Sequence, residues 1–119
     1  MKGQNQWRRA GFAFSGLREA WRSEVSIRIE VVGLVFVCGF LAWLKPDLVW
    51  WGLVIALAAA ILAAELMNSA IERLSDHLHP EKHDAIKAVK DMAAGAVMVL
   101  ALAATAMVVL LLLASGVIG

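Results

Sequence analysis

The chain has 119 residues, which suits one domain, and 61% of them are hydrophobic, with a mean hydropathy of +0.75. This apolar share is well above the roughly 45–50% of ordinary soluble domains and indicates a membrane protein. The net charge of +1 and the lack of a dense Arg/Lys cluster argue against a nucleic-acid partner. A single cysteine, Cys38, excludes an internal disulfide, and we expect it in a core or facing lipid.

The first segment, "WRRAGFAFSGLREAWRSE", is charged and aromatic at once. On a helical projection its large apolar side chains share one broad face: Trp7, Phe14, Leu17 and Trp21. We predict an amphipathic helix over about residues 5–23 in the membrane interface, with a simple basic anchor as the alternative. No cleavable signal peptide is expected, because the first apolar run begins only after Glu30.

Three apolar runs follow, and we predict membrane helices over about residues 25–44, 48–76 and 86–118. A hydrocarbon core about 30 Å thick needs roughly 20 helical residues. Pro46, flanked by tryptophans, breaks the chain between the first two runs, and the polar "HLHPEKHDAI" separates the last two. Small residues in the third run allow close helix packing, so we expect a homo-oligomer.

The positive charges predict how the protein is oriented. Of eleven Lys and Arg residues, only Lys45 falls in the first turn, whereas the others lie well before that turn or surround the second break. The positive-inside rule then places the N-terminus and the second loop in the cytoplasm, and the C-terminus outside.

The stretch "AAELMNSAIERLSD", residues 63–76, carries a polar stripe at the end of an apolar helix. Spacings of three, four and four residues place its members on one helical face: Glu65, Asn68, Glu72 and Asp76. The predicted orientation puts this stripe at the cytoplasmic membrane surface. Further ionisable groups open the other two spans at the same depth: Glu24, Arg28, Glu30, Lys90 and Asp91.

Three interpretations of this polar layer compete. The first is a structural seam, in which carboxylates pair with basic residues of other helices: Arg28, Arg73, Lys87 or Lys90. The second is proton or ion conduction, which needs a series of acidic groups across the bilayer. The third span offers no polar residues beyond Thr105 and Ser115 to extend such a series. The third is a divalent cation with a phosphorylated ligand, because Mg²⁺ usually binds one or two carboxylates plus substrate phosphates. A carboxylate left over could then act as a general base.

Two other site types are disfavoured. The three histidines of "HLHPEKH" suggest zinc, but no cysteine or carboxylate completes a ligand pattern with them. No Gly-rich phosphate-binding loop of the common nucleotide-binding folds occurs in the sequence.

Three segments, "GLREAWRSEVSIRIE", "AELMNSAIERLSD" and "KAVKDMAAGAV", resemble signature segments of the small integral-membrane diacylglycerol kinases of bacteria. The resemblance implies an all-α homotrimer in the bacterial inner membrane, with active sites shared between subunits. It also implies transfer of the γ-phosphoryl group of MgATP to 1,2-diacylglycerol, giving phosphatidic acid. A sister group with nearly the same motif phosphorylates undecaprenol, and a non-enzymatic scaffold or transport subunit is the remaining alternative.

The resemblance also implies roles for individual residues. Glu65 would be the base on the lipid hydroxyl, supported by Asn68, and Glu24 with Glu72 would hold Mg²⁺. The residues implied to contact the nucleotide are Phe12, Glu24, Glu72, Glu81, Lys82, His83, Lys90 and Asp91. Those implied to line the lipid site are Arg9, Arg18, Trp21, Ser26, Ile27, Arg28, Ile29, Glu30, Glu65 and Ala94. Phe12 replaces an aromatic hydroxyl of the family and Asn5 replaces an arginine, and Asp76 has no implied role.

Overall fold

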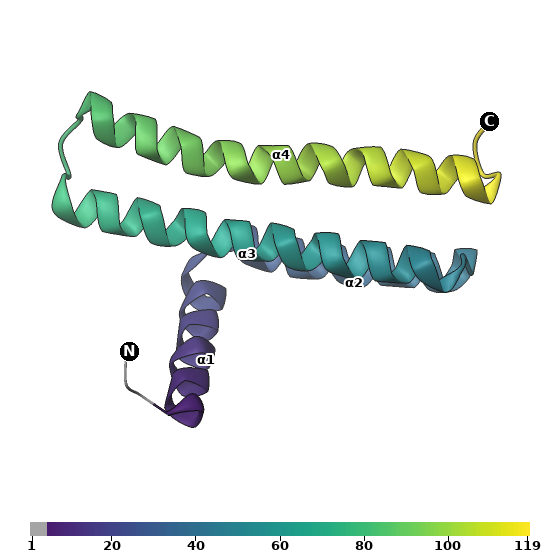
Figure 1. The fold of residues 1–119 in the computed structure, drawn as a ribbon, viewed down its shortest axis with the longest axis horizontal. Coiled ribbons are helices and arrows are strands. Elements are labelled where there is room, and N and C mark those ends of the chain that lie inside the picture. Colours follow the sequence, from purple (N-terminus) through teal and green to yellow (C-terminus); the bar gives the residue numbers. More distant parts are fainter. Residues whose placement is uncertain (1–4) are drawn as a thin grey trace.

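The computed structural model describes residues 5–119 as an all-helical chain, and its helices are α1 (Gln6–Ser23), α2 (Val25–Leu44), α3 (Leu48–Leu78) and α4 (Asp84–Ser115). In Figure 1, α2, α3 and α4 run along the long axis of the molecule, and α1 projects away from them. Helix α3 packs against both α2 and α4. The predicted all-α fold with three long apolar helices is confirmed, although α3 ends two residues later and α4 begins two residues earlier than expected.

Helix α1 begins at a conventional cap, where the Asn5 side chain accepts a hydrogen bond of 2.9 Å from the backbone N–H of Arg8. It ends at Ser23, and Glu24 alone, with an extended backbone (φ −110°, ψ 108°), joins it to α2. A single non-helical residue therefore redirects the chain from α1 into α2 (Figure 1). We call this residue and the helix ends beside it the α1–α2 junction.

Helices α2 and α3 form an antiparallel pair joined by residues 45–47. Lys45 ends α2 in the left-handed region (φ 54°, ψ 54°), as is common just after a helix. Pro46 then disfavours a helical conformation for the residue before it. We call this end of the molecule the turn end, and the opposite end, with residues 24–30 and 65–91, the loop end.

The core of the chain is small and lies at the turn end. Leu41, Val54 and Leu111 form a buried cluster there, packed against partly buried neighbours: Leu44, Trp50, Trp51 and Met107. Only 6–11% of the most apolar stretch of each long helix is buried within the chain. Such apolar surface is not stable in water, and the three helices are long and apolar enough to cross a membrane.

Helix α3 is longer than a membrane span requires. Its 31 residues extend over about 46 Å, against about 30 Å for a hydrocarbon core. The polar residues begin at Glu65 and occupy nearly the last half of the helix, so they lie at or beyond the membrane surface when the apolar part is in lipid. The excess length therefore places the polar stripe where water can reach it.

Candidate active site

Three predicted site residues on α2 and α3 lie close together in the structure. The Ser26 hydroxyl donates a hydrogen bond to Glu65 Oε2 over 3.4 Å, and the Glu30 carboxylate lies beside that of Glu65. The first turns of α2 thus lie beside the point where α3 changes from apolar to polar. The predicted base and two predicted lipid-site residues therefore share one location.

Two buried oxygen atoms in this region have no hydrogen-bond partner within the described chain. They are Glu30 Oε2 and Asn68 Oδ1. Buried polar atoms nearly always find a partner in a protein, so such exceptions mark places where another molecule or ion can bind. Asn68 lies one turn beyond Glu65 on the same face of α3. Its side chain offers a free acceptor next to the predicted base.

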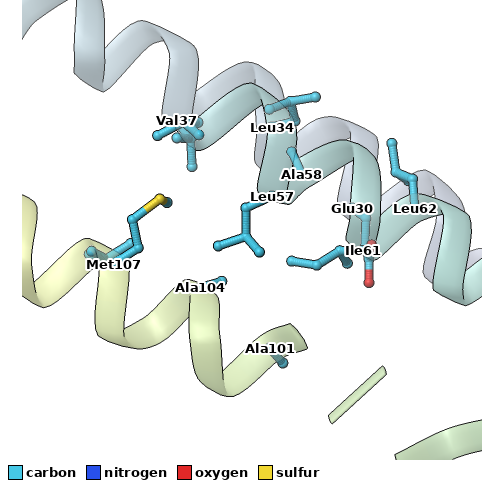
Figure 2. Close-up of a pocket in the computed structure, with 12 residues that line it drawn as sticks. Glu30, Leu34, Val37, Leu57, Ala58, Ile61, Leu62, Ala101, Ala104 and Met107 are labelled. Carbon is cyan, nitrogen blue, oxygen red and sulfur yellow. The ribbon is translucent and has the colours of Figure 1, made fainter. Parts of the chain in front are cut away.

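A groove of about 290 Å³ runs from this place along the apolar part of the molecule. Figure 2 shows Glu30 at one end and Met107 toward the other, with side chains of α2, α3 and α4 between them. Glu30 carries the only charge among the lining residues. The groove therefore has a polar end beside Glu65 and an apolar body.

A second polar cluster surrounds the loop between α3 and α4. Lys90 Nζ lies 2.8 Å from Asp76 Oδ1, and Lys87 pairs with Asp91 one turn apart on α4. A pocket of about 500 Å³ opens under the loop. It brings together five of the residues that the resemblance links to the nucleotide: Glu81, Lys82, His83, Lys90 and Asp91. Asp76 was without a predicted role, and the structure makes it the partner of Lys90.

A third cluster is centred on Arg73, which the sequence indicates only as a possible partner in a structural seam. Its Nη2 lies 3.1 Å from Glu24 Oε1 and also donates to Ser23 Oγ, and its Nη1 lies 3.5 Å from Glu19 Oε1. The signal in the sequence was weak, because the partners are 49 to 54 residues away. The seam interpretation is correct in part, since Arg73 and Lys90 do join helices through ion pairs.

The two carboxylates implied to bind Mg²⁺ have different neighbours in the single chain. Glu24 pairs with Arg73, whereas the exposed Glu72 is within electrostatic range of Lys90. Residues 5–119 contain no group of three or more His, Cys, Asp or Glu side chains placed to hold a metal ion. Carboxylate oxygens are nevertheless the donors that Mg²⁺ prefers, and one or two of them suffice when nucleotide phosphates complete the shell. Glu24 and Glu72 therefore have the donor type that suits Mg²⁺, but the described residues of one chain do not form a metal site.

The remaining predicted site residues lie along α1, in the first turns of α2 and on α4. Ile27 is buried and Arg28 is half-buried. The others are exposed: Arg9, Phe12, Arg18, Trp21, Ile29 and Ala94. Between α1 and α3 lies a groove of about 480 Å³, lined by small side chains and edged by Glu19, Glu24 and Arg73.

Three apolar helices with polar groups concentrated at one end define a membrane-spanning protein with a candidate site near one membrane surface. The model of the prokaryotic diacylglycerol kinase family matches residues 11–112. The diacylglycerol kinase of Escherichia coli (strain K12) is 33% identical over 90 residues, which are 76% of this chain and 74% of that protein.

Two further relatives come from other bacteria. The diacylglycerol kinase of Helicobacter pylori (strain J99) is 34% identical over 85 residues, 71% of this chain and 66% of that protein. The undecaprenol kinase of Bacillus subtilis (strain 168) is 35% identical over 88 residues, 72% of this chain and 70% of that protein. The chain belongs to the prokaryotic diacylglycerol kinase family. It is a kinase that acts on a lipid, and a multi-pass bacterial membrane protein, as its sequence predicted.

Proposed function

We propose that this kinase transfers the γ-phosphoryl group of ATP to the primary hydroxyl of 1,2-diacylglycerol and releases phosphatidic acid and ADP. The observation that carries this proposal is the position of Glu65, beside the polar end of the apolar groove. A lipid bound there has its hydroxyl at the carboxylate and an acyl chain along the groove. Family membership supports the same substrate class.

The chemistry assigned to this place is general base catalysis. The Glu65 carboxylate accepts the proton of the lipid hydroxyl while that oxygen attacks the γ-phosphorus and ADP leaves. The Asn68 side chain, with its unpartnered Oδ1, lies one turn from Glu65 and can help to orient the single free hydroxyl of the lipid. Phosphoryl transfer requires little more of the protein than positioning and charge neutralisation, and a few well-placed polar groups meet that need.

The nucleotide is assigned to the pocket under the α3–α4 loop. Lys90 offers a point charge for a phosphate once it leaves Asp76, and Glu81, Lys82 and His83 line the same pocket. Mg²⁺ held by Glu24 and Glu72 would neutralise the charge of the nucleotide phosphates. Because these two carboxylates have different neighbours in one chain, we propose that a homotrimer completes the site with groups from adjacent subunits.

The proposed topology puts the loop end in the cytoplasm, where ATP is available, and the turn end outside. The charge distribution supports this orientation. Helix α1 would then lie in the cytoplasmic interface. Its exposed apolar side chains, among them Trp7 and Phe14, support that position, because aromatic residues favour the headgroup region.

The second candidate substrate is undecaprenol. The undecaprenol kinase of Bacillus subtilis is as similar to this chain as the diacylglycerol kinases are, so this alternative stays open. A scaffold or transport role is set aside, because the family is one of kinases.

The purified protein in mixed micelles, given ATP labelled in the γ-phosphate, tests the proposal with each lipid in turn. We expect labelled phosphatidic acid to form with a kcat/KM at least tenfold above that for undecaprenol, a difference of about 1.4 kcal/mol in transition-state binding. A preference for undecaprenol would contradict the diacylglycerol assignment and support the alternative.

A further inference from the structure

Arg73 is the residue that joins α1 to α3. Among the described residues it makes every polar side-chain contact between these two helices. The groove beside it is lined mostly by apolar side chains, among them Ala13, Leu17, Leu66 and Ala70, and apolar contacts fix a direction less than hydrogen bonds do. The direction of α1 therefore depends strongly on one guanidinium group.

The contacts of Arg73 are concentrated on the α1–α2 junction. The guanidinium contacts Glu19 and Ser23 at the end of α1 and also Glu24, the one non-helical residue between the helices. The Ser23 hydroxyl in turn donates to the backbone carbonyl of Glu19 over 2.7 Å. A planar group with several donors can fix three acceptors at once, which a lysine cannot do with the same geometry.

Charge gives Arg73 a second effect at this place. Glu19 and Glu24 are like charges that share its guanidinium, and without it their carboxylates repel each other. The Glu24 side chain is only 26% exposed, less than that of Glu19 at 53%, so it has less water to compensate for a lost partner. Removing Arg73 should therefore move Glu24 as well as loosen α1.

We propose that Arg73 is a positioning residue, which holds the α1–α2 junction against α3 and thereby fixes the place of the Glu24 carboxylate, the proposed ligand of the nucleotide-bound cation. The part that concerns the cation rests on the proposed function, whereas the part that concerns α1 does not. Residues that orient a metal-binding carboxylate typically change metal affinity when they are replaced.

The first test measures the direction of α1 without any ligand. Spin labels are attached to cysteines placed at the exposed Ser15 of α1 and Leu78 of α3, in a Cys38→Ala background. Labelled chains are diluted with unlabelled ones, so that only distances within one chain are recorded. We expect a narrow distance distribution that broadens or shifts in Arg73→Ala and is restored only in part in Arg73→Lys, which keeps the charge but not the planar set of donors.

Arg22→Ala is the matched control, because Arg22 lies in the last turn of α1 but forms no ion pair within the described residues. It should leave the distribution unchanged. An unchanged distribution in Arg73→Ala, or an equal broadening in Arg22→Ala, would overturn the proposal that Arg73 holds the junction.

The second test measures kinetics in the same variants. Arg73→Ala should raise the concentration of Mg²⁺ needed for half-maximal rate by about tenfold at saturating ATP, with a smaller change in kcat. A fall in kcat alone would contradict the role toward Glu24. If the wild-type protein phosphorylates neither lipid, the proposed function fails, and the distance measurement alone decides whether Arg73 holds α1.

Discussion

At the turn end of the molecule, Leu41, Val54 and Leu111 are 0–4% exposed and the chain reverses through a short, well-defined turn. At the loop end, two buried oxygen atoms lack partners within the described residues, and acidic and basic side chains gather around two pockets. The turn end contains the buried apolar cluster, whereas the loop end contains the ion pairs and the two buried oxygen atoms without a partner. The difference separates the part of the chain that maintains the fold from the part that binds and reacts.

The largest effect should come from Glu65→Gln at the loop end. The amide keeps the shape and can still accept the hydrogen bond from Ser26, but it cannot take a proton from the lipid hydroxyl. We expect kcat to fall by about 10²–10⁴-fold with the unfolding midpoint nearly unchanged. The initial rate of labelled phosphatidic acid formation gives the result.

Asp47→Asn provides the control for that change, because Asp47 is a carboxylate at the turn end, before α3. It should retain the wild-type rate. Near-normal turnover in Glu65→Gln would remove Glu65 from the role of base.

The second effect is on stability and belongs to the turn end. Leu41→Ala opens a cavity in the one buried cluster and should lower the free energy of unfolding by about 2 kcal/mol. This value is at the low end for buried leucine, because lipid removes much of the gain from water exclusion. Val35→Ala, at a site 66% exposed, should change stability little. Unfolding in a denaturing detergent, followed by circular dichroism, measures both, and equal losses would contradict the proposed difference.

The third effect concerns the nucleotide pocket at the loop end. Lys90→Met removes the charge assigned to a phosphate and should raise the KM for MgATP by about tenfold, corresponding to about 1.4 kcal/mol. Steady-state kinetics at saturating lipid measure this change. Lys45→Met removes a lysine at the turn end and should leave the KM unaltered, and a rise of the same size in both variants would point to a general charge effect instead.

The smallest effect should be a gain at the turn end. Lys45 is the only non-glycine residue among the described ones with a positive φ, and glycine adopts this conformation at no steric cost. Lys45→Gly should stabilise the protein by up to about 1 kcal/mol without changing the rate. Loss of stability in this variant would show that the side chain contributes more than the backbone strain costs.

The sequence was sufficient to predict the helices and the polar stripe. Long apolar runs and Pro46 indicate where the helices begin and end, and the spacing of Glu65, Asn68 and Glu72 places them on one helical face. Both signals are local and are visible in a single sequence. The seam interpretation named Arg73 and Lys90 as possible partners of carboxylates, but it did not predict which carboxylate each would meet, because that depends on how separate helices pack. The lack of a partner for Asn68 Oδ1 could not be predicted for the same reason, because only the packed structure shows which acceptors have a donor.

The most direct test of the central claim measures two properties of two variants, the phosphate transfer per folded molecule and the unfolding midpoint of Glu65→Gln and Leu41→Ala. We predict that Glu65→Gln loses transfer but keeps its midpoint, and that Leu41→Ala lowers the midpoint but keeps transfer per folded molecule. If both variants lose both properties to a similar degree, the two ends do not have separate tasks, and the account is contradicted.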